Sequence, residues 1–97
     1  MEYKLVDNKD RKRYEYQLDG GIALVEYIKT QNKIYLTHTE VPSKFAGQGI
    51  ASALVKDALT EVEKTGLKLV PLCPYVAAYI KRHPEWKRLL DDNVNVG

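Results

Sequence analysis

The sequence predicts an α+β domain with a mixed, mostly antiparallel sheet and the element order ββββ-α-β-α. Two features of the chain support this prediction. The first half contains four short segments with the period-two alternation of β-strands, separated by turn residues. The second half changes to the spacing of an amphipathic helix, and a further short strand and a second helix follow.

The first half predicts an antiparallel meander. In RYEYQL, the side chains of Tyr14, Tyr16 and Leu18 alternate with polar ones, as in a strand with one buried face. The glycines of the DGG segment that follows tolerate the positive φ of a tight hairpin turn. The TQNK segment predicts a second turn, before a stretch rich in β-branched and aromatic residues. The four strands are expected at 2–6, 13–18, 22–28 and 34–41.

The second half predicts two helices on either side of a short strand. From Ile50 the apolar residues recur every three or four positions, which predicts a helix with one buried stripe. Gly66 is expected to end this helix as a left-handed cap. The LKLV segment (67–70) predicts a strand parallel to the preceding one, because a helix joins the two. The second helix is expected at 73–83, and Pro84 blocks its continuation.

Length and composition predict a single cytoplasmic domain. The 97 residues accommodate one core, so a domain over 1–97 is expected, with a frayed tail after about residue 90. An apolar share of 44% and a net charge of +2 are typical of an ordinary soluble protein. The one cysteine fits a reducing compartment. The first residues lack the apolar run of a secretory signal, and no segment approaches the roughly 18 apolar residues of a membrane helix.

The turn before the first helix predicts either an anion site or a tight turn that binds nothing. Gly47 and Gly49 stand at the mouth of the helix, where a glycine costs about 1 kcal/mol relative to alanine. A strand, a Gly-x-Gly turn and a helix place unpaired backbone N–H groups at the positive end of the helix dipole, which favours a phosphate. Ile50 and Ala51 stand where a P-loop has Lys-Ser/Thr, and the meander argues against a dinucleotide-binding βαβ unit.

These residues resemble the pyrophosphate-binding motif of the GNAT superfamily of acyl-CoA-dependent N-acetyltransferases. That motif is Gln/Arg-x-x-Gly-x-Gly/Ala, and this chain matches it at Gly49 and Ala51. Ala46 stands where the family has Gln or Arg, and Lys44 supplies a basic residue two positions earlier. The ordered set HTEVP, GQGIA, LCPY and HPEW is similar, more narrowly, to the small single-domain members of the superfamily, over residues 13 to 87.

The resemblance implies that acetyl-CoA is the cosubstrate and that acetyl is transferred to an amine, which the sequence does not identify. It also implies that backbone groups near Glu40, Val41 and Pro42 hold the pantetheine arm and that the thioester sits near Cys73. A monomer or a weak dimer is expected, with exposed strand edges available for pairing. The residues expected to hold the pyrophosphate are Ala46, Gly47, Gln48, Gly49, Ile50, Ala51 and Ser52.

Cys73 is the expected N-cap of the second helix, because Pro74 follows it and proline is favoured at the first helical position. The positive end of a helix favours the nucleophilic thiolate, whereas a lone cysteine is usually a small buried apolar residue. Two routes therefore compete. In one, Cys73 accepts the acetyl group and passes it on. In the other, the amine attacks the thioester directly while a base removes its proton.

His38 and Glu40 are the candidate bases. They share one strand face, because side chains repeat every two residues, and histidine titrates near neutral pH. The alternatives are a cross-strand hydrogen-bonding role for His38 and a solvated charge or turn cap for Glu40. With no further ligands nearby, the pair does not predict a metal site. Tyr75 and Tyr79 are available as the acid that many of these enzymes carry, but Ile80 stands in the expected register.

Two other classes of function are also considered. A domain of the same fold can bind CoA or a protein partner without catalysis, because so short a chain has little left for an acceptor pocket. The stretch KDRKRYEY (9–16) interleaves basic residues with tyrosines, as RNA-binding surfaces do. Asp10 and Glu15 interrupt this stretch, however, and solvated hairpin charge explains it more simply. Nucleic acid is therefore not an expected partner.

Overall fold

A computed structural model describes residues 3–97 of the chain and gives them one five-stranded sheet and four helical segments. The strands lie in the order β1-β2-β3-β4-β5. Neighbouring strands are antiparallel, except that β4 and β5 are parallel. The predicted α+β class and the mixed, mostly antiparallel sheet are confirmed. The elements are β1 (Val6–Asn8), β2 (Arg13–Leu18), β3 (Gly21–Lys29), β4 (Lys33–Glu40), the 3-10 helix η1 (Ser43–Phe45), α1 (Ile50–Thr65), β5 (Lys68–Pro71), α2 (Pro74–Arg82) and the 3-10 helix η2 (Pro84–Leu89).

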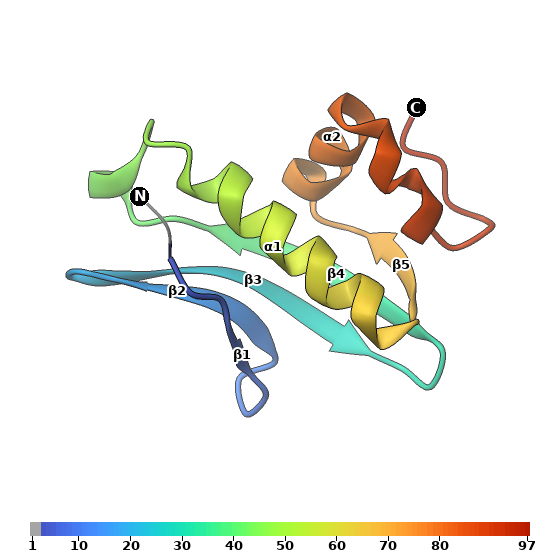
Figure 1. Cartoon of the computed structure of the whole chain (residues 1–97), viewed down its shortest axis with the longest axis horizontal. Coiled ribbons are helices and arrows are strands. Elements are labelled where there is room, and N and C mark those ends of the chain that lie inside the picture. The colour runs from blue at the N-terminus through green and yellow to red at the C-terminus, as the bar shows by residue number, and fades with distance from the viewer. Residues whose placement is uncertain (1–2) are drawn as a thin grey trace.

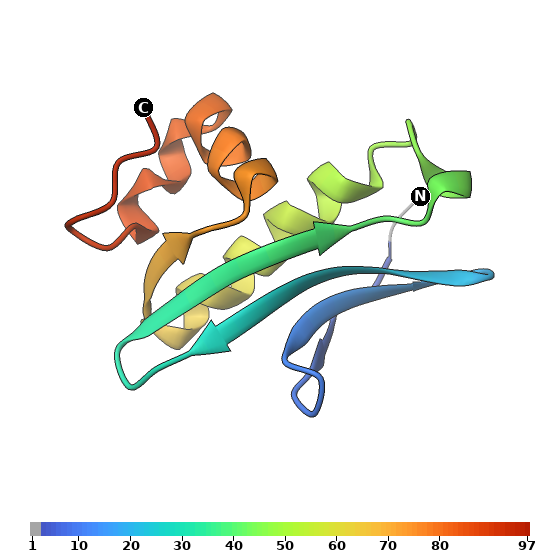
Figure 2. The ribbon, with the colours of Figure 1, turned by 180° about the vertical axis from the view of Figure 1, so that it is seen from behind.

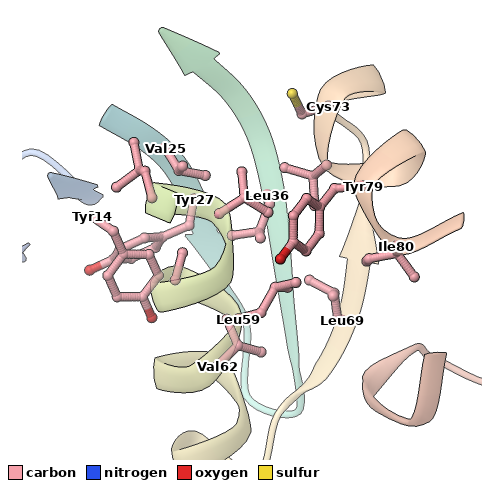
Figure 3. Close-up of a cluster of buried hydrophobic side chains, with 14 of the residues drawn as sticks. Tyr14, Val25, Tyr27, Leu36, Leu59, Val62, Leu69, Cys73, Tyr79 and Ile80 are labelled. Carbon is pink, nitrogen blue, oxygen red and sulfur yellow. The ribbon is translucent and has the colours of Figure 1, made fainter. Parts of the chain in front are cut away.

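One core lies between the sheet and α1. Figure 1 shows α1 in front of the sheet, and Figure 2 shows the sheet in front of α1 from behind. The predicted apolar stripe of α1 is buried and packs with alternate residues of β2 and β3. Helix α2 contributes Val76, Tyr79 and Ile80 to the same cluster. Figure 3 shows Tyr79 beside Leu36 and Leu69, where α2 meets β4 and β5.

Strand β1 lies further along the chain than the sequence predicts. The expected strand at 2–6 is wrong for the described residues, because pairing with β2 occupies Val6–Asn8. Residue 2 lies outside the described residues. The ring of Tyr3 packs at a tilt against that of Tyr16, with centroids 5.3 Å apart, and Tyr3 and Leu5 both pack against the core. Burial of these two apolar side chains therefore takes the chain away from the ladder before Val6.

Helix η2 has no counterpart in the prediction. Pro84 ends α2, as expected, but it also begins η2, because the first position of a helix does not need an N–H donor. The new turn buries Trp86 and Leu89. After it, the backbone N–H of Asp91 donates to the carbonyl of Leu69 at 2.9 Å. Whether the tail after about residue 90 frays remains a prediction.

Strand β4 contains a bulge that reverses which of its side chains face the helices. Leu36 pairs with Tyr27, but His38 pairs with Glu26, so Thr37 is an extra residue on β4. The Thr37 hydroxyl donates to the carbonyl of Glu26 at 3.3 Å. Because strand side chains alternate between faces, an inserted residue moves every later side chain to the other face.

Strands β4 and β5 pair over only the first half of β4. Their pairing ends where Leu36 meets Pro71, and the Leu36 carbonyl then accepts the N–H of Cys73 at 2.9 Å. From Thr37 to Glu40, β4 keeps β3 on one side and has no strand on the other side within residues 3–97. Figure 3 shows β4 diverging from the segment that enters α2, with Cys73 at the divergence.

Candidate functional site

A cavity of about 250 Å³ lies where the end of β4, the start of α1 and the first turn of α2 converge. It brings together most of the residues that the sequence predicts for cofactor binding. Phe45 of η1 was not among the predicted site residues, and Tyr75 was predicted only as a candidate acid. The lining consists of Val41, Phe45, Ala46, Gly47, Gly49, Ile50, Ala51, Ser52 and Tyr75.

Gln48 and Pro42, two of the predicted residues, lie outside this cavity. Gln48 lines a second cavity of about 130 Å³, which shares Gly49 and Ile50 with the first. Pro42 is the N-cap of η1, and its carbonyl accepts the N–H of Phe45 at 2.9 Å. The glycine turn is thus a common wall of two cavities, and Pro42 positions the loop that leads to it.

Both glycines of the turn have a left-handed backbone. The φ angle is 79° at Gly47 and 78° at Gly49, which is the N-cap of α1. A β-carbon at either position would meet no atom within 4 Å. The structure therefore requires glycine for its conformational freedom rather than for clearance from a neighbouring protein atom. The open space also leaves the backbone of the turn accessible to a ligand.

The turn presents a run of unpaired backbone N–H groups. From Gly47 to Ser52, no backbone N–H donates to an acceptor in the part of the chain that the structure describes. No side chain caps the start of α1, and no acidic residue lies in its first turn. Free N–H groups at the positive end of a helix of this length attract an anion.

Cys73 is the N-cap of α2, as the sequence predicts, and is 5% exposed. Its carbonyl accepts the N–H of Ala77 at 3.0 Å, the first bond of the helix. The sulfur does not cap the helix; it lies 3.3 Å from the Oγ1 of Thr39, and either atom can donate. In Figure 3 the sulfur points away from the packed ring of Tyr79, toward the divergence of β4 and α2.

His38 and Glu40 share a face, as expected, but it is the face opposite Cys73. Thr39 pairs with Val25, a fully buried core residue, so Thr39 faces the helices. His38 and Glu40, on either side of Thr39, face away and are exposed. The structure does not bring them together with Cys73, and their role as bases remains a prediction. Thr39, whose hydroxyl lies beside the Cys73 sulfur, was not among the site residues predicted from the sequence.

The two tyrosines of α2 lie in different environments. Tyr75 is 36% exposed and lines the 250 Å³ cavity. Tyr79 is buried, and its ring packs at a tilt against that of His83 with centroids 4.3 Å apart. Burial, followed by the charge of Glu85, raises the pKa of the Tyr79 phenol. Ile80, which stands in the register expected for the acid, lies in the core. Of the two tyrosines, Tyr75 is the one that borders the cavity.

The basic stretch at 9–16 does not form a base-stacking surface. Its tyrosines, Tyr14 and Tyr16, are buried in the core and cannot stack on nucleobases. Tyr16 donates instead to the carboxylate of Asp57 on α1. The lysines of the stretch contribute to a cavity of about 260 Å³ that is lined by Lys9, Lys12, Tyr27 and Lys29.

Residues 3–97 contain neither a cluster of metal ligands nor a membrane-spanning helix. Within that range, no three side chains of His, Cys, Asp or Glu come together as a metal site would require. Over the same residues, no helix has the length and apolarity to cross a bilayer. The 16 residues of α1 carry charged side chains on the face away from the core.

Comparison with known proteins agrees with the resemblance in the sequence. A family model described as GCN5-related N-acetyl-transferase matches residues 13–89, which include the glycine turn and Cys73. Protein NATD1 from Xenopus tropicalis is 37% identical over 81 residues, covering 77% of this chain and 73% of that protein. Protein NATD1 from Gallus gallus has the same identity and coverage. Protein NATD1 from Homo sapiens is 36% identical over 81 residues, covering 77% and 71%.

Proposed function

Because the chain belongs to the GCN5-related N-acetyltransferase family, we propose that it binds acetyl-CoA and transfers the acetyl group to an amine. The observation that carries the proposal is the run of unpaired N–H groups from Gly47 to Ser52, beside a 250 Å³ cavity. A pyrophosphate would be bound there by backbone donors and by the dipole of α1. These residues fit the group, because no capping side chain or first-turn carboxylate competes with it.

The unpaired half of β4 supports a position for the rest of the cosubstrate. Within residues 3–97, the backbone groups from Thr39 to Val41 have no strand partner on the side away from β3, so the amides of the pantetheine arm can bond to them. Phe45 and Tyr75 offer aromatic surface on the cavity wall. The thioester at the end of the arm would then lie beside Cys73.

Two chemical routes differ in whether Cys73 carries the acetyl group. In the covalent route, the Cys73 thiolate attacks the acetyl carbonyl, the C–S bond to CoA breaks, and the CoA thiolate takes up the proton that Cys73 released. The neutral amine then attacks the acetyl group on Cys73, the C–S bond to Cys73 breaks, and the Cys73 thiolate takes up the amine proton. In the direct route, the neutral amine attacks the thioester, CoA leaves as the thiolate, and the amine proton passes to a base.

The side chains around the sulfur bear on both routes. Thr39 can hold the Cys73 thiol through the 3.3 Å contact between Oγ1 and Sγ. His38 and Glu40 are the titratable groups at the same end of β4, but they lie on its other face. Either of them can act as the base only on an acceptor that approaches from that exposed face or through a water.

The first experiment is a titration of the ¹⁵N-labelled chain with acetyl-CoA, followed by amide chemical shifts. We expect saturable shifts in residues 46–52 and in the first turn of α2, around Cys73 and Tyr75. The amide resonances of the β3–β4 turn (residues 30–32), at the opposite end of β4 from the cavity, should not shift, and they serve as the internal control. Absence of shifts in residues 46–52 at millimolar acetyl-CoA would contradict the proposal.

The second experiment compares Cys73→Ala with the wild type. Acetyl transfer is measured with a panel of amines (a lysine peptide, a peptide N-terminus and an aminoglycoside), and acetyl-CoA affinity is measured in parallel. The covalent route predicts a large loss of transfer with affinity retained, and an acetyl adduct on the wild-type chain in intact-mass spectra. Unchanged transfer by Cys73→Ala excludes that route. Saturable binding without transfer to any amine would instead favour a noncatalytic CoA-binding domain.

A further inference from the structure

The glycine turn separates two cavities of different character. The 250 Å³ cavity has Val41, Phe45 and Tyr75 on its wall, whereas the 130 Å³ cavity has Tyr3 and Gln48. Gly49 and Ile50 belong to both, so the unpaired N–H groups of the turn lie between them. A ligand that occupies both cavities would therefore carry an anionic group at its middle. An acyl-CoA has this arrangement, because a pyrophosphate joins its pantetheine arm to adenosine.

Tyr3 is held as a platform at the second cavity. Its ring packs against that of Tyr16 in a tilted arrangement, with centroids 5.3 Å apart and an angle of 35° between the ring planes. Tyr16 is buried in the core, and its hydroxyl donates to Asp57 of α1. Tyr3 is itself half-buried against the core and borders the cavity. A nucleobase can stack on an aromatic ring that is fixed in this way.

Gln48 adds a polar edge to the same cavity. Its side chain is exposed and carries both an acceptor oxygen and a donor NH₂ group, and this pairing matches the acceptor and donor on the edge of adenine. The volume of about 130 Å³ is that of about four water molecules in the liquid, so it suits one flat ring system. One purine could thus stack on the ring of Tyr3 while the edge of the purine forms hydrogen bonds with the Gln48 side chain.

We propose that Tyr3 and Gln48 form the binding site for the adenine ring of acyl-CoA, an inference that rests on the proposed function of the neighbouring cavity. The pyrophosphate would lie on the N–H groups of the turn between the two halves of the molecule. Residues 3–5, which do not pair in the sheet, would then contribute to cosubstrate affinity.

Isothermal titration calorimetry with two ligands tests this proposal. One ligand is CoA, and the other is 4′-phosphopantetheine, which keeps one phosphate of the pyrophosphate but lacks the other phosphate and the 3′-phosphoadenosine. We expect Tyr3→Ala to weaken CoA binding by about 10-fold, as for loss of a stacked base, and to bind phosphopantetheine within about twofold of the wild type. Tyr3→Phe should keep the wild-type affinity for both. Tyr35→Ala, a half-buried tyrosine of β4 that lines neither cavity, is the matched control.

The possible outcomes separate this inference from the proposed function. Unchanged CoA affinity in Tyr3→Ala overturns the adenine site and leaves acetyl-CoA binding standing. An equal loss for both ligands also overturns it, because Tyr3 would then act through the fold. If wild-type chain binds neither ligand, the proposed function and this inference fail together. Should thermal denaturation show that Tyr3→Ala is unfolded, Gln48→Ala decides: it must weaken CoA binding several-fold and spare phosphopantetheine.

Discussion

Gly49 has a backbone conformation that side-chain-bearing residues adopt only with strain. Its φ is 78°, and a β-carbon there would meet no other atom, so the cost of a side chain is conformational. We expect Gly49→Ala to lower the free energy of unfolding by about 1 kcal/mol. Gly49→Asn should cost less, because asparagine tolerates the left-handed region. Urea denaturation measures both, and equal losses would show that φ is not the cause.

Glu15 is a buried carboxylate on β2, 2% exposed. Its Oε2 lies 2.6 Å from the Nε of Arg13 and accepts from the Nδ2 of Asn8 at 3.3 Å. Burial alone would raise the pKa of Glu15. The hydrogen bonds from Arg13 and Asn8 and the charge of Arg13 outweigh that effect, so the pKa lies below its ordinary value.

The lowered pKa of Glu15 predicts a pH dependence of stability. A carboxyl group whose pKa is lower in the folded chain stabilises the fold at any pH above its unfolded pKa of about 4.3. That stabilisation is lost as the pH falls from there through the folded pKa. Glu15→Gln should therefore show a shallower loss of unfolding free energy below about pH 4 than the wild type does. Parallel profiles from urea denaturation in acid would refute the role of Glu15.

The bulge at Thr37 explains why the sequence did not predict which side chains of β4 lie beside Cys73. Leu36 is buried in the core, so regular alternation would turn His38 and Glu40 toward the helices. The extra residue reverses this, and Thr39 takes their place beside Cys73. A pattern of alternating residues does not reveal an inserted one. The glycine turn, by contrast, was predictable because its chemistry is local to a few consecutive residues.

The backbone amides of β4 are expected to fall into a slowly and a rapidly exchanging group along the strand. Up to Leu36 it pairs with strands on both sides, and beyond Leu36 β3 is its one strand neighbour among the residues that the structure describes. In hydrogen exchange, the amides after Leu36 that point away from β3 should exchange much faster than those before it. Acetyl-CoA should slow the exchange of these amides. Uniform protection along β4 in the ligand-free chain would contradict the half-paired strand.

Among the elements, those with a periodic pattern were the most predictable. The bounds of β2 and α1 coincide with the sequence prediction, because alternation and the 3.6-residue stripe decide them locally. The parallel pairing of β5 followed from the helix that joins it to β4. Strand β1 was misplaced because its position depends on contacts of Tyr3 with Tyr16, which are distant in sequence. Helix η2 was missed because Pro84 both ends one helix and begins another.

For the molecule as a whole, the segment after η2 closes the outer edge of the sheet. Leu90 forms a parallel bridge with Leu69 of β5, the last strand. The N–H of Asp91 donates to Leu69, and the Asp91 carboxylate lies 3.7 Å from the Nζ of Lys33. These contacts cover the side of β5 that has no strand partner within residues 3–97, where an open edge would invite pairing with another chain.

Truncation tests the contribution of this segment. A chain that ends at Leu89 loses a half-buried leucine and a backbone hydrogen bond, so its free energy of unfolding should fall by about 2 kcal/mol. A chain that ends at Asp92 keeps both the leucine and the hydrogen bond. Of the residues it lacks, only Val96 packs on the core, so its free energy of unfolding should fall by less. Urea denaturation compares the two. Equal losses would place the stabilisation in the last five residues rather than at β5.

The half-paired β4 also bears on how long a molecule of this protein survives. The half of β4 that has a strand on one side lies at the place that the proposed cosubstrate would cover. A ligand that binds only the folded chain stabilises it by about 2.7 kcal/mol at 100 times its dissociation constant. Where reclosing is fast, proteolysis follows the population of the opened chain. The half-life of the chain in the presence of a protease should therefore lengthen with added acetyl-CoA. The supply of this metabolite would then influence the abundance of the protein before any acetyl group is transferred.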